Sequence, residues 1–310
     1  FLFSLIFLSL FIFFFFHKNN ENSSNSFFFL SKETAIVINN WFMMYFLSVV
    51  LIGTIYPIFL DVLSSQKISV GPPFYHKLII PFLIPFLLIM AIGPKLKWIK
   101  SNLEDKAYLF TLLIISILLS VFIVKNYSSN FLINSVLISS GLYLFFTTLR
   151  DFFSKGLKNL SQNTAHFGFS LLILSILFNN LFSTEIITNL KVGETFENTK
   201  AKIVFESISQ NQQKNYNSIV AKFTVQDSMG ELENLSPELR IYNQPNIVTS
   251  EADIKTTLLS DKFIVINVVQ NQEFFNVRYQ VKPFMLWIWI SVILISVGGL
   301  ISFMKKEYEK

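Results

Sequence analysis

Long runs of apolar residues, separated by short polar segments, fill most of the first 182 positions and return near the end of the chain. A helix that crosses the hydrocarbon core of a bilayer needs about 20 mostly apolar residues. Seven segments meet or approach that length and are predicted to span a membrane: 1–16, 41–60, 78–94, 108–124, 131–148, 164–182 and 284–303. Pro81 and Pro85 lie in the third segment and predict a kink in its helix.

The basic residues of the short loops predict the orientation of these spans. Loops on one side carry 12 Lys and Arg residues, whereas loops on the other side carry 3. Loops rich in Lys and Arg stay on the inner side of a membrane. The amino terminus is therefore predicted to lie outside and the carboxyl-terminal tail inside, which places the long segment 183–283 outside.

Segment 183–283 has a different periodicity from the spans. Apolar side chains recur at every second position of 219–225 and of 275–282, a pattern typical of half-buried strands. The apolar run 262–269 predicts a strand that is buried on both faces, and the polar stretch 210–215 predicts an exposed hairpin loop. We therefore expect a small, mostly antiparallel β domain here.

The predicted fold is a polytopic α-helical membrane protein of about seven spans, with one small, mostly β domain on the outer side before the last span. The three expected parts are a membrane domain at 1–182, the β-rich domain at 183–283, and the final span with its inner tail at 284–310. Composition agrees, since 52% of the residues are hydrophobic and only 15% are charged. The chain has no cysteine, which excludes disulfides, thiolate catalysis and Cys-ligated metals.

His166 is the candidate site residue, because it lies inside the sixth predicted span and near its inner end. An ionisable side chain in a span is costly and is therefore a functional hypothesis by default. A neutral imidazole can ligate haem iron, and Gly168 would let a large planar group or another helix approach. The alternative is an interfacial histidine that bonds to water or to a carbonyl, and the residues alone leave both interpretations open.

The other candidates favour structural roles. His17 is expected to anchor the end of the first span at the membrane interface, and His76 to belong to a turn in an outer loop. Asp61 is expected to cap or position the loop that follows the second span, and Arg240 to pair with Glu238 or another acid in the β domain.

Several segments carry specific motifs in a fixed order. The stretch 51–98 carries the loop GPPFY, and SKETAIVINN precedes it at 31–40. AHFG lies at 165–168, LSPELRIYNQPNIVTSEADI at 235–254, and the junction KPFMLWIW inside 277–303. These segments resemble the CcmF/NrfE family, the haem lyase component of System I cytochrome c maturation. AHFG looks like the family's histidine-led span, and the last two segments resemble its last outer domain and last helix.

The resemblance covers only the carboxyl-terminal half of the family's length. The family's tryptophan-rich haem-handling segment lies upstream of this region, and its counterpart is missing: Trp41 and Trp98 are isolated, while Trp287 and Trp289 belong to the last span. Split versions of the family occur in mitochondria, which suits a composition rich in Phe, Ile, Asn and Lys that is typical of an AT-rich genome. The expected location is the mitochondrial inner membrane, with a bacterial inner membrane as the alternative.

The resemblance implies that His166 is an axial ligand of a membrane b-type haem whose second ligand comes from another polypeptide. It also implies that the chain helps to attach haem to apocytochrome c. The implied partners are an amino-terminal CcmF-like subunit with the tryptophan-rich segment, other maturation proteins including the haem chaperone, apocytochrome c and the lipid bilayer, but no nucleic acid. The alternatives are a structural membrane subunit without haem and, less favoured for want of an internal repeat, a transporter.

Overall fold

The computed structural model describes residues 4, 7–9, 11, 12, 15, 28–64, 68–100, 106–125, 127, 130–154, 159–227, 230–269 and 273–308. These residues fall into two units, one formed by 1–70 with 92–104 and the other by 71–91 with 105–310. We call them the first and the second unit. The second unit contains most of the spans, all of the strands and His166.

Six described helices are long and apolar enough to cross a membrane. They are α2 (Lys32–Ser64), α3 (Pro72–Ile92), α4 (Lys106–Val124), α5 (Phe131–Ser154), α6 (Leu160–Phe182) and α7 (Met285–Tyr308). They match six of the seven predicted spans and confirm the polytopic fold. Most of the predicted span 1–16 lies outside the described residues.

Two of these helices begin earlier than the apolar runs predict, because polar and proline residues suit a first turn. The hydroxyl of Ser31 accepts a hydrogen bond from the backbone N–H of Thr34 at 3.2 Å and so caps α2. Pro72 and Pro73 begin α3, where the missing N–H of proline costs nothing. Helix α3 then continues through Pro81 and Pro85.

In the first unit, the segment after the short 3-10 helix η1 (Gly93–Lys95) contacts the first turn of α2. The backbone N–H of Ile99 donates to both carboxylate oxygens of Glu33, at 2.9 and 3.1 Å. The ammonium group of Lys32 lies 5.0 Å from the ring centroid of Trp98. These contacts are all local to the start of α2.

In the second unit, α5 is the most buried span and carries many small polar residues. The Ser120 hydroxyl of α4 donates to the Ser135 carbonyl of α5 at 2.5 Å, and the Ser161 hydroxyl of α6 donates to the Gly298 carbonyl of α7 at 2.9 Å. Lipid provides no hydrophobic force between helices, so small residues and interhelical hydrogen bonds stabilise such a bundle.

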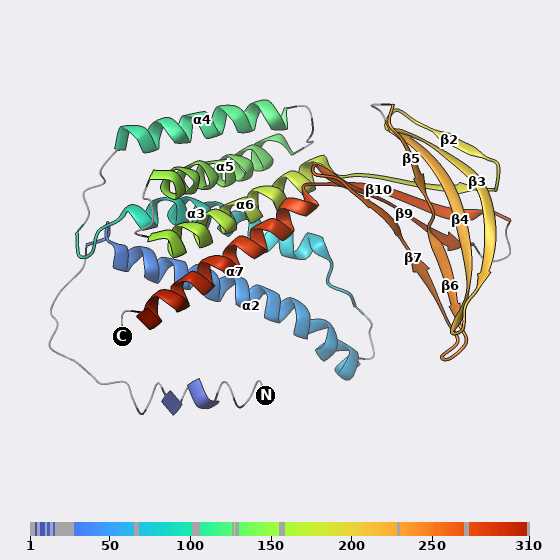
Figure 1. Cartoon of the computed structure of the whole chain (residues 1–310). Helices are drawn as coiled ribbons and strands as arrows, with labels where there is room; N and C mark the ends of the chain where they lie inside the picture. The colour runs from blue at the N-terminus through green and yellow to red at the C-terminus, as the bar shows by residue number, and fades with distance from the viewer. Residues whose placement is uncertain are drawn as a thin grey trace. The chain divides into compact units, whose positions relative to one another are not determined.

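The ten strands lie between α6 and α7 (Figure 1). They are β1 (Thr184–Leu190), β2 (Thr195–Glu197), β3 (Ala201–Gln212), β4 (Tyr216–Asp227), β5 (Leu232–Leu235), β6 (Glu238–Tyr242), β7 (Ile247–Glu251), β8 (Asp253–Thr256), β9 (Ser260–Val268) and β10 (Phe275–Pro283). One antiparallel sheet has the order β1-β10-β9-β8, and the other has the order β2-β3-β4-β6-β7 with β5 paired to β4.

The two sheets pack face to face around one apolar core, as in a β-sandwich. The first sheet contributes Ile264, Ile266 and Val277, and the second contributes Phe205 and Phe223, whose rings stack with centroids 4.4 Å apart. The mostly antiparallel β domain predicted from the alternation is confirmed.

Two details differ from the sequence-based expectation. Strand β9 was predicted to be buried on both faces, yet only the side with Lys262, Ile264 and Ile266 is buried, while Phe263 and Val265 are half-exposed. One face of the sheet packs on the sandwich core, and the other face is turned away from it. The hairpin predicted at 210–215 is present, but β3 runs to Gln212 and leaves a shorter loop.

The first and last strands pair with each other and continue the two neighbouring helices α6 and α7. Thr184 of β1 pairs with Val281 of β10, directly after α6 ends and before α7 begins. The Asn179 amide of α6 donates to the Pro283 carbonyl at 2.5 Å, and the Trp287 indole of α7 donates to the Leu258 carbonyl at 2.9 Å. The sandwich is therefore joined to α6 and α7 by side-chain hydrogen bonds as well as by the chain itself.

Glu185 provides a test of the β1–β10 pairing. Hydrogen bonds from Gln280 and Arg278 lower the pKa of the Glu185 carboxyl group. Because the pKa is lower in the folded state, the ionised carboxylate stabilises the fold. This contribution to the free energy of unfolding is complete above the unfolded pKa of about 4.3 and is lost as the pH falls through the folded pKa. We expect Glu185→Gln to lower the melting temperature at pH 7, measured by circular dichroism, and the difference from wild type to shrink as the pH falls below the unfolded pKa and through the lower folded pKa.

A matched control is Glu273→Gln, because the Glu273 side chain is 88% exposed in its pair with Lys191. Exposed pairs contribute little to stability. A difference between wild type and Glu185→Gln that stays constant with pH would contradict the assignment.

Candidate functional site

His166 lies in the second turn of α6 and is half-buried. Residues three or four positions away share its face of the helix, namely Gln162, which is exposed, Asn163, Phe169 and Ser170. Asn163 and Ser170 are buried and bond to α5, whereas Phe169 contacts α3. The imidazole therefore belongs to the side of α6 that is turned toward α5 and α3.

Polar contacts fix α6 against α5 on both sides of the histidine. The Asn163 amide donates to the Asp151 carbonyl at 3.1 Å. The hydroxyl groups of Thr148 and Ser170 lie 2.6 Å apart and form a buried hydrogen bond. Ligands placed on rigid helices hold their geometry better than ligands on loops, so these contacts suit a fixed imidazole.

Phenylalanine rings surround this part of α6. Phe167 packs against Phe145 and Phe152 of α5, with ring centroids 5.8 and 5.3 Å apart. Phe169 meets Phe86 of α3 edge to face at 6.5 Å. An apolar, aromatic environment around a ligating residue keeps water away and is one of the levers by which a protein tunes a metal.

Glycines bring α7 close to α6 beside His166. A Cβ added to Gly168 would lie 2.9 Å from the backbone nitrogen of Ile295, and one added to Gly298 would lie 2.7 Å from the backbone nitrogen of Ala165. Of the two neighbours predicted for Gly168, a planar group or another helix, the structure shows the helix, because α7 occupies the space that a side chain would need.

The site supplies one imidazole. Metal–imidazole bonds are about 2 Å long, so two axial nitrogens on one iron lie about 4 Å apart. His76 and Asn180 line the same cavity of about 770 Å³. Asn180 lies fourteen positions beyond His166 in α6, which corresponds to about 21 Å along the helix axis. His76 and His166 therefore cannot ligate the same iron. The described residues contain no group of three or more His, Cys, Asp or Glu side chains that could hold a metal ion.

The chemistry of these residues is compatible with a single imidazole ligand to a bound metal group. The imidazole is half-buried, its helix is held by α3, α5 and α7, and the adjoining side chains are aromatic or small.

The remaining sequence candidates lie on other elements than His166 or outside the described residues. His76 lies in the first turns of α3 rather than in a loop, because the two prolines before it start the helix. Asp61 is exposed in the last turn of α2, and His17 lies outside the described residues. Arg240 does pair with Glu238, at 3.1 Å, as predicted.

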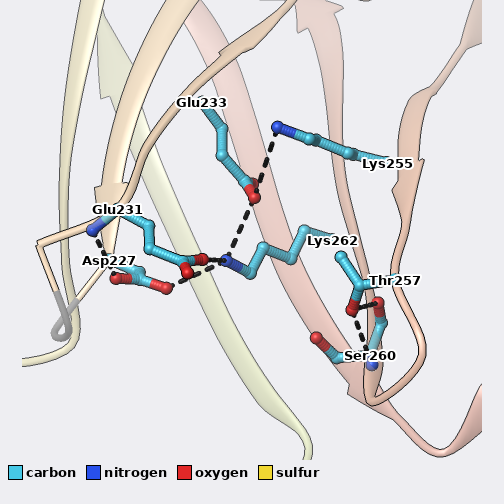
Figure 2. Close-up of polar contacts among 7 residues, drawn as sticks. All are labelled: Asp227, Glu231, Glu233, Lys255, Thr257, Ser260 and Lys262. Carbon is cyan, nitrogen blue, oxygen red and sulfur yellow. Dashed lines mark hydrogen bonds and ion pairs between the residues drawn. The ribbon is translucent and has the colours of Figure 1, made fainter.

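A buried cluster of charged side chains at one end of the sandwich core was not predicted from the sequence. Lys262 of β9, with a side chain only 8% exposed, donates to Asp227 at 2.9 Å and to Glu233 at 3.2 Å (Figure 2). Glu231 lies 3.5 Å from the same ammonium group, and Lys255 lies 3.6 Å from Glu233. The cluster connects the inner faces of the two sheets.

Lys262 stays charged although it is buried. Burial alone would lower the pKa of Lys262, but the hydrogen bonds to Asp227 and Glu233 outweigh it and raise that pKa, so the ammonium form persists. A signal for the cluster exists in the sequence, since Lys262 has the same strand parity as Ile264 and Ile266. A lysine at an inward-facing position requires a buried partner.

The comparisons with known proteins agree on one family. Residues 181–283, which contain all ten strands, match the family model described as the CcmF C-terminal beta-sandwich. The chain is 28% identical over 275 residues to the cytochrome c-type biogenesis protein CcmF of Pseudomonas fluorescens, covering 84% of this chain and 42% of that protein. It is 23% identical over 259 residues to the probable cytochrome c-type biogenesis protein NrfE of Escherichia coli, covering 83% and 36%.

A solved structure titled cytochrome c heme lyase CcmF has the same fold, with a TM-score of 0.69 and 20% identity over 88% of this chain and 46% of that one. The chain thus spans less than half the length of these relatives. Residues 181–283 thus match the CcmF C-terminal beta-sandwich family, and over most of its length the chain is similar in sequence and in fold to part of the CcmF and NrfE proteins.

Proposed function

We propose that this chain is the carboxyl-terminal part of a cytochrome c haem lyase of System I, and that His166 is one axial ligand of a membrane b-type haem. A haem iron bound there would supply one-electron chemistry. The chain's own residues would hold the iron ligand, exclude water with Phe86, Phe167 and Phe169, and present the β-sandwich beyond the membrane. Attachment of haem to apocytochrome c would need further residues from a partner.

One observation carries the proposal. His166 is a half-buried imidazole on a helix that is fixed from three sides, by Thr148 and Asp151 of α5, by Phe86 of α3 and by Gly298 of α7. A histidine that served only as an interfacial anchor would not need this rigid, aromatic surrounding. Its position in the inner half of the span, by the charge-based orientation, suits a haem within the bilayer.

The proposed partners start from the single imidazole that the described residues place at this site. We infer that an amino-terminal CcmF-like subunit with the tryptophan-rich segment supplies the second ligand and the surface for incoming haem. The haem chaperone and apocytochrome c would meet this complex on the side of the sandwich. We place it in the mitochondrial inner membrane with the sandwich in the intermembrane space, on the strength of the AT-rich composition; a bacterial inner membrane is the alternative.

The test is the optical spectrum of this chain co-purified with that amino-terminal subunit. Wild type is expected to show a reduced b-type band, and His166→Ala to lose it. Because Ala could also disturb packing, His166→Gly with added imidazole is the second variant. Imidazole can replace a missing axial ligand, so partial return of the band would identify a ligand rather than a structural residue.

His76→Ala is the matched control and is expected to keep the band, since His76 lines a cavity with Asn180, which lies about 21 Å beyond His166 along α6. Haem retained in His166→Ala would contradict the ligand assignment. No haem in any preparation would support the alternative, a structural membrane subunit that has the fold without the cofactor.

A further inference from the structure

The cavity of about 770 Å³ that His76 and Asn180 line lies among three helices of the second unit, near the predicted outer ends of α3, α5 and α6. Its volume is within the range of about 300–1,000 Å³ that is usual for sites of small ligands. The polar side chains that line it are those of His76, Lys77, Asn130, Asn134 and Asn180. The rest of its lining is apolar.

The polar part of this cavity is basic. Lys77 is exposed, and no carboxylate is among the described residues that line the cavity. The other polar side chains, an imidazole and three amides, can all donate hydrogen bonds. Lys77 is also one of only 3 basic residues in the short loops predicted to lie outside, against 12 inside, which is a departure from the usual bias. The lining therefore favours a ligand with negative charge.

The start of α5 adds to the positive potential of Lys77. Leu132 and Ile133 line the cavity and belong to the first turn of α5, which begins at Phe131. Backbone N–H groups in the first turn of a helix have no partner within the helix, and the helix dipole gives this end a partial positive charge. Both effects act in the same direction as the lysine.

The lining changes from polar to apolar along the helices. Ile80 and Ile84 follow Lys77 on α3, and the distance from Lys77 to Ile84 is about 10 Å along the helix axis. On α5, Val136 follows the polar residues in the same way, and its side chain is 48% exposed. Since both helices are long and apolar enough to cross a membrane, acyl chains can reach this apolar part from the side.

The cavity also separates one half of α3 from the rest of the bundle. The buried residues of α3 are Phe86, Leu87 and Ala91, which all follow Pro85. Before that proline, Lys77 and Pro81 are exposed and line the cavity. The inner half of α3 is therefore packed, whereas its outer half leaves room for a ligand between α3, α5 and α6.

We propose that this cavity binds an anionic phospholipid of the outer leaflet. Its phosphodiester group would accept hydrogen bonds from the Lys77 ammonium group and the Asn180 amide, and an acyl chain would lie along Ile80, Ile84 and Val136. A soluble phosphate would leave the apolar part unoccupied. A zwitterionic lipid has the same phosphodiester group, but its cationic headgroup would find Lys77 and no carboxylate beside it. The site therefore selects a membrane lipid by its net charge.

The test is native mass spectrometry of the full chain, released from nanodiscs that contain equal amounts of phosphatidylglycerol and phosphatidylcholine. Wild type is expected to retain phosphatidylglycerol about tenfold over phosphatidylcholine, the effect of about one hydrogen bond between charged groups. Lys77→Gln is expected to remove this preference. Lys77→Arg is expected to keep it, because a guanidinium group carries the same charge.

The matched control is Lys125→Gln. Lys125 directly follows α4, is exposed and belongs to a loop on the same predicted side, but it is not among the residues that line the cavity. This variant loses the same charge and is expected to keep the wild-type preference. Soluble glycerophosphate at millimolar concentration is expected not to displace the lipid, because it has no acyl chain to contact α3 and α5.

Equal retention of the two lipids by wild type would overturn the proposal. An equal loss of preference in Lys77→Gln and Lys125→Gln would also overturn it, since that result would indicate an effect of surface charge alone. Displacement by glycerophosphate would identify a site for soluble phosphate instead, and loss of the lipid on addition of the amino-terminal subunit would identify a protein interface. The assay needs no haem, so its outcome is separate from the test of His166.

Discussion

Replacing Gly298 with leucine is expected to destabilise the helix bundle by about 3 kcal/mol or more. The reason is steric, because a Cβ at this position would lie 2.7 Å from the backbone nitrogen of Ala165 and 2.9 Å from the Ser161 carbonyl oxygen. Backbone atoms cannot rotate away as a side chain can, so α6 and α7 must separate. Overpacking of a closely packed site typically costs about 1–3 kcal/mol, and a leucine adds three carbon atoms beyond the Cβ.

The measurement is thermal unfolding of the full chain in detergent, with Gly299→Leu as the control. A Cβ at Gly299 would have nothing within 4 Å, so the control variant adds the same side chain to the same turn without a clash. Ala165 directly precedes His166, and we therefore also expect Gly298→Leu to weaken any haem band that depends on His166. Equal losses of stability in the two variants would contradict the close packing of α6 against α7.

The membrane spans could be predicted because one physical length determines them. The hydrocarbon core requires a helix of about 20 apolar residues, and α4 and α6 end where their apolar runs end, at Val124 and Phe182. The starts of α2 and α3 were less predictable, because Ser31 and the prolines at 72 and 73 extend the helices into polar sequence.

The strands could be predicted from their alternation, but their partners could not. Thr184 pairs with Val281 across nearly the whole domain, and this register places the ends of α6 and α7 side by side. Period-two patterns report which face of a strand is buried and contain no information about which strand lies beside it. The order of the two sheets is therefore a result of the structure.

At the candidate site, too, one part could be predicted from the sequence and another part could not. His166 was found from sequence because an ionisable residue inside a span is rare. Its neighbours were not, since the rotation of α6 against α3 and α5 depends on packing of side chains such as Phe86 and Thr148. The burial of Lys262 was not predicted, because the apolar run 262–269 that it begins was interpreted as a strand buried on both faces. Its position two residues before Ile264 places its side chain on the inner face of that strand.

The second large effect is expected from Lys262→Met, which keeps the aliphatic stem and removes the charge. Asp227 and Glu233 would then remain buried near each other without their main counter-ion, at 2.9 and 3.2 Å in the wild type. Removing one partner of a buried ion pair typically costs about 3–5 kcal/mol. We expect the β-sandwich to become sensitive to protease at correspondingly lower denaturant, measured by pulse proteolysis of the full chain.

The control is Lys202→Met, because Lys202 and Glu197 form an ion pair at 3.2 Å whose side chains are 44% and 66% exposed. Exposed pairs contribute at most about 1 kcal/mol, so this variant should resemble the wild type. A triple variant that adds Asp227→Asn and Glu233→Gln to Lys262→Met should recover part of the lost stability, because it removes the uncompensated charge instead of restoring the pair. If the triple variant were less stable than Lys262→Met, the cost would lie in lost hydrogen bonds between the sheets rather than in buried charge.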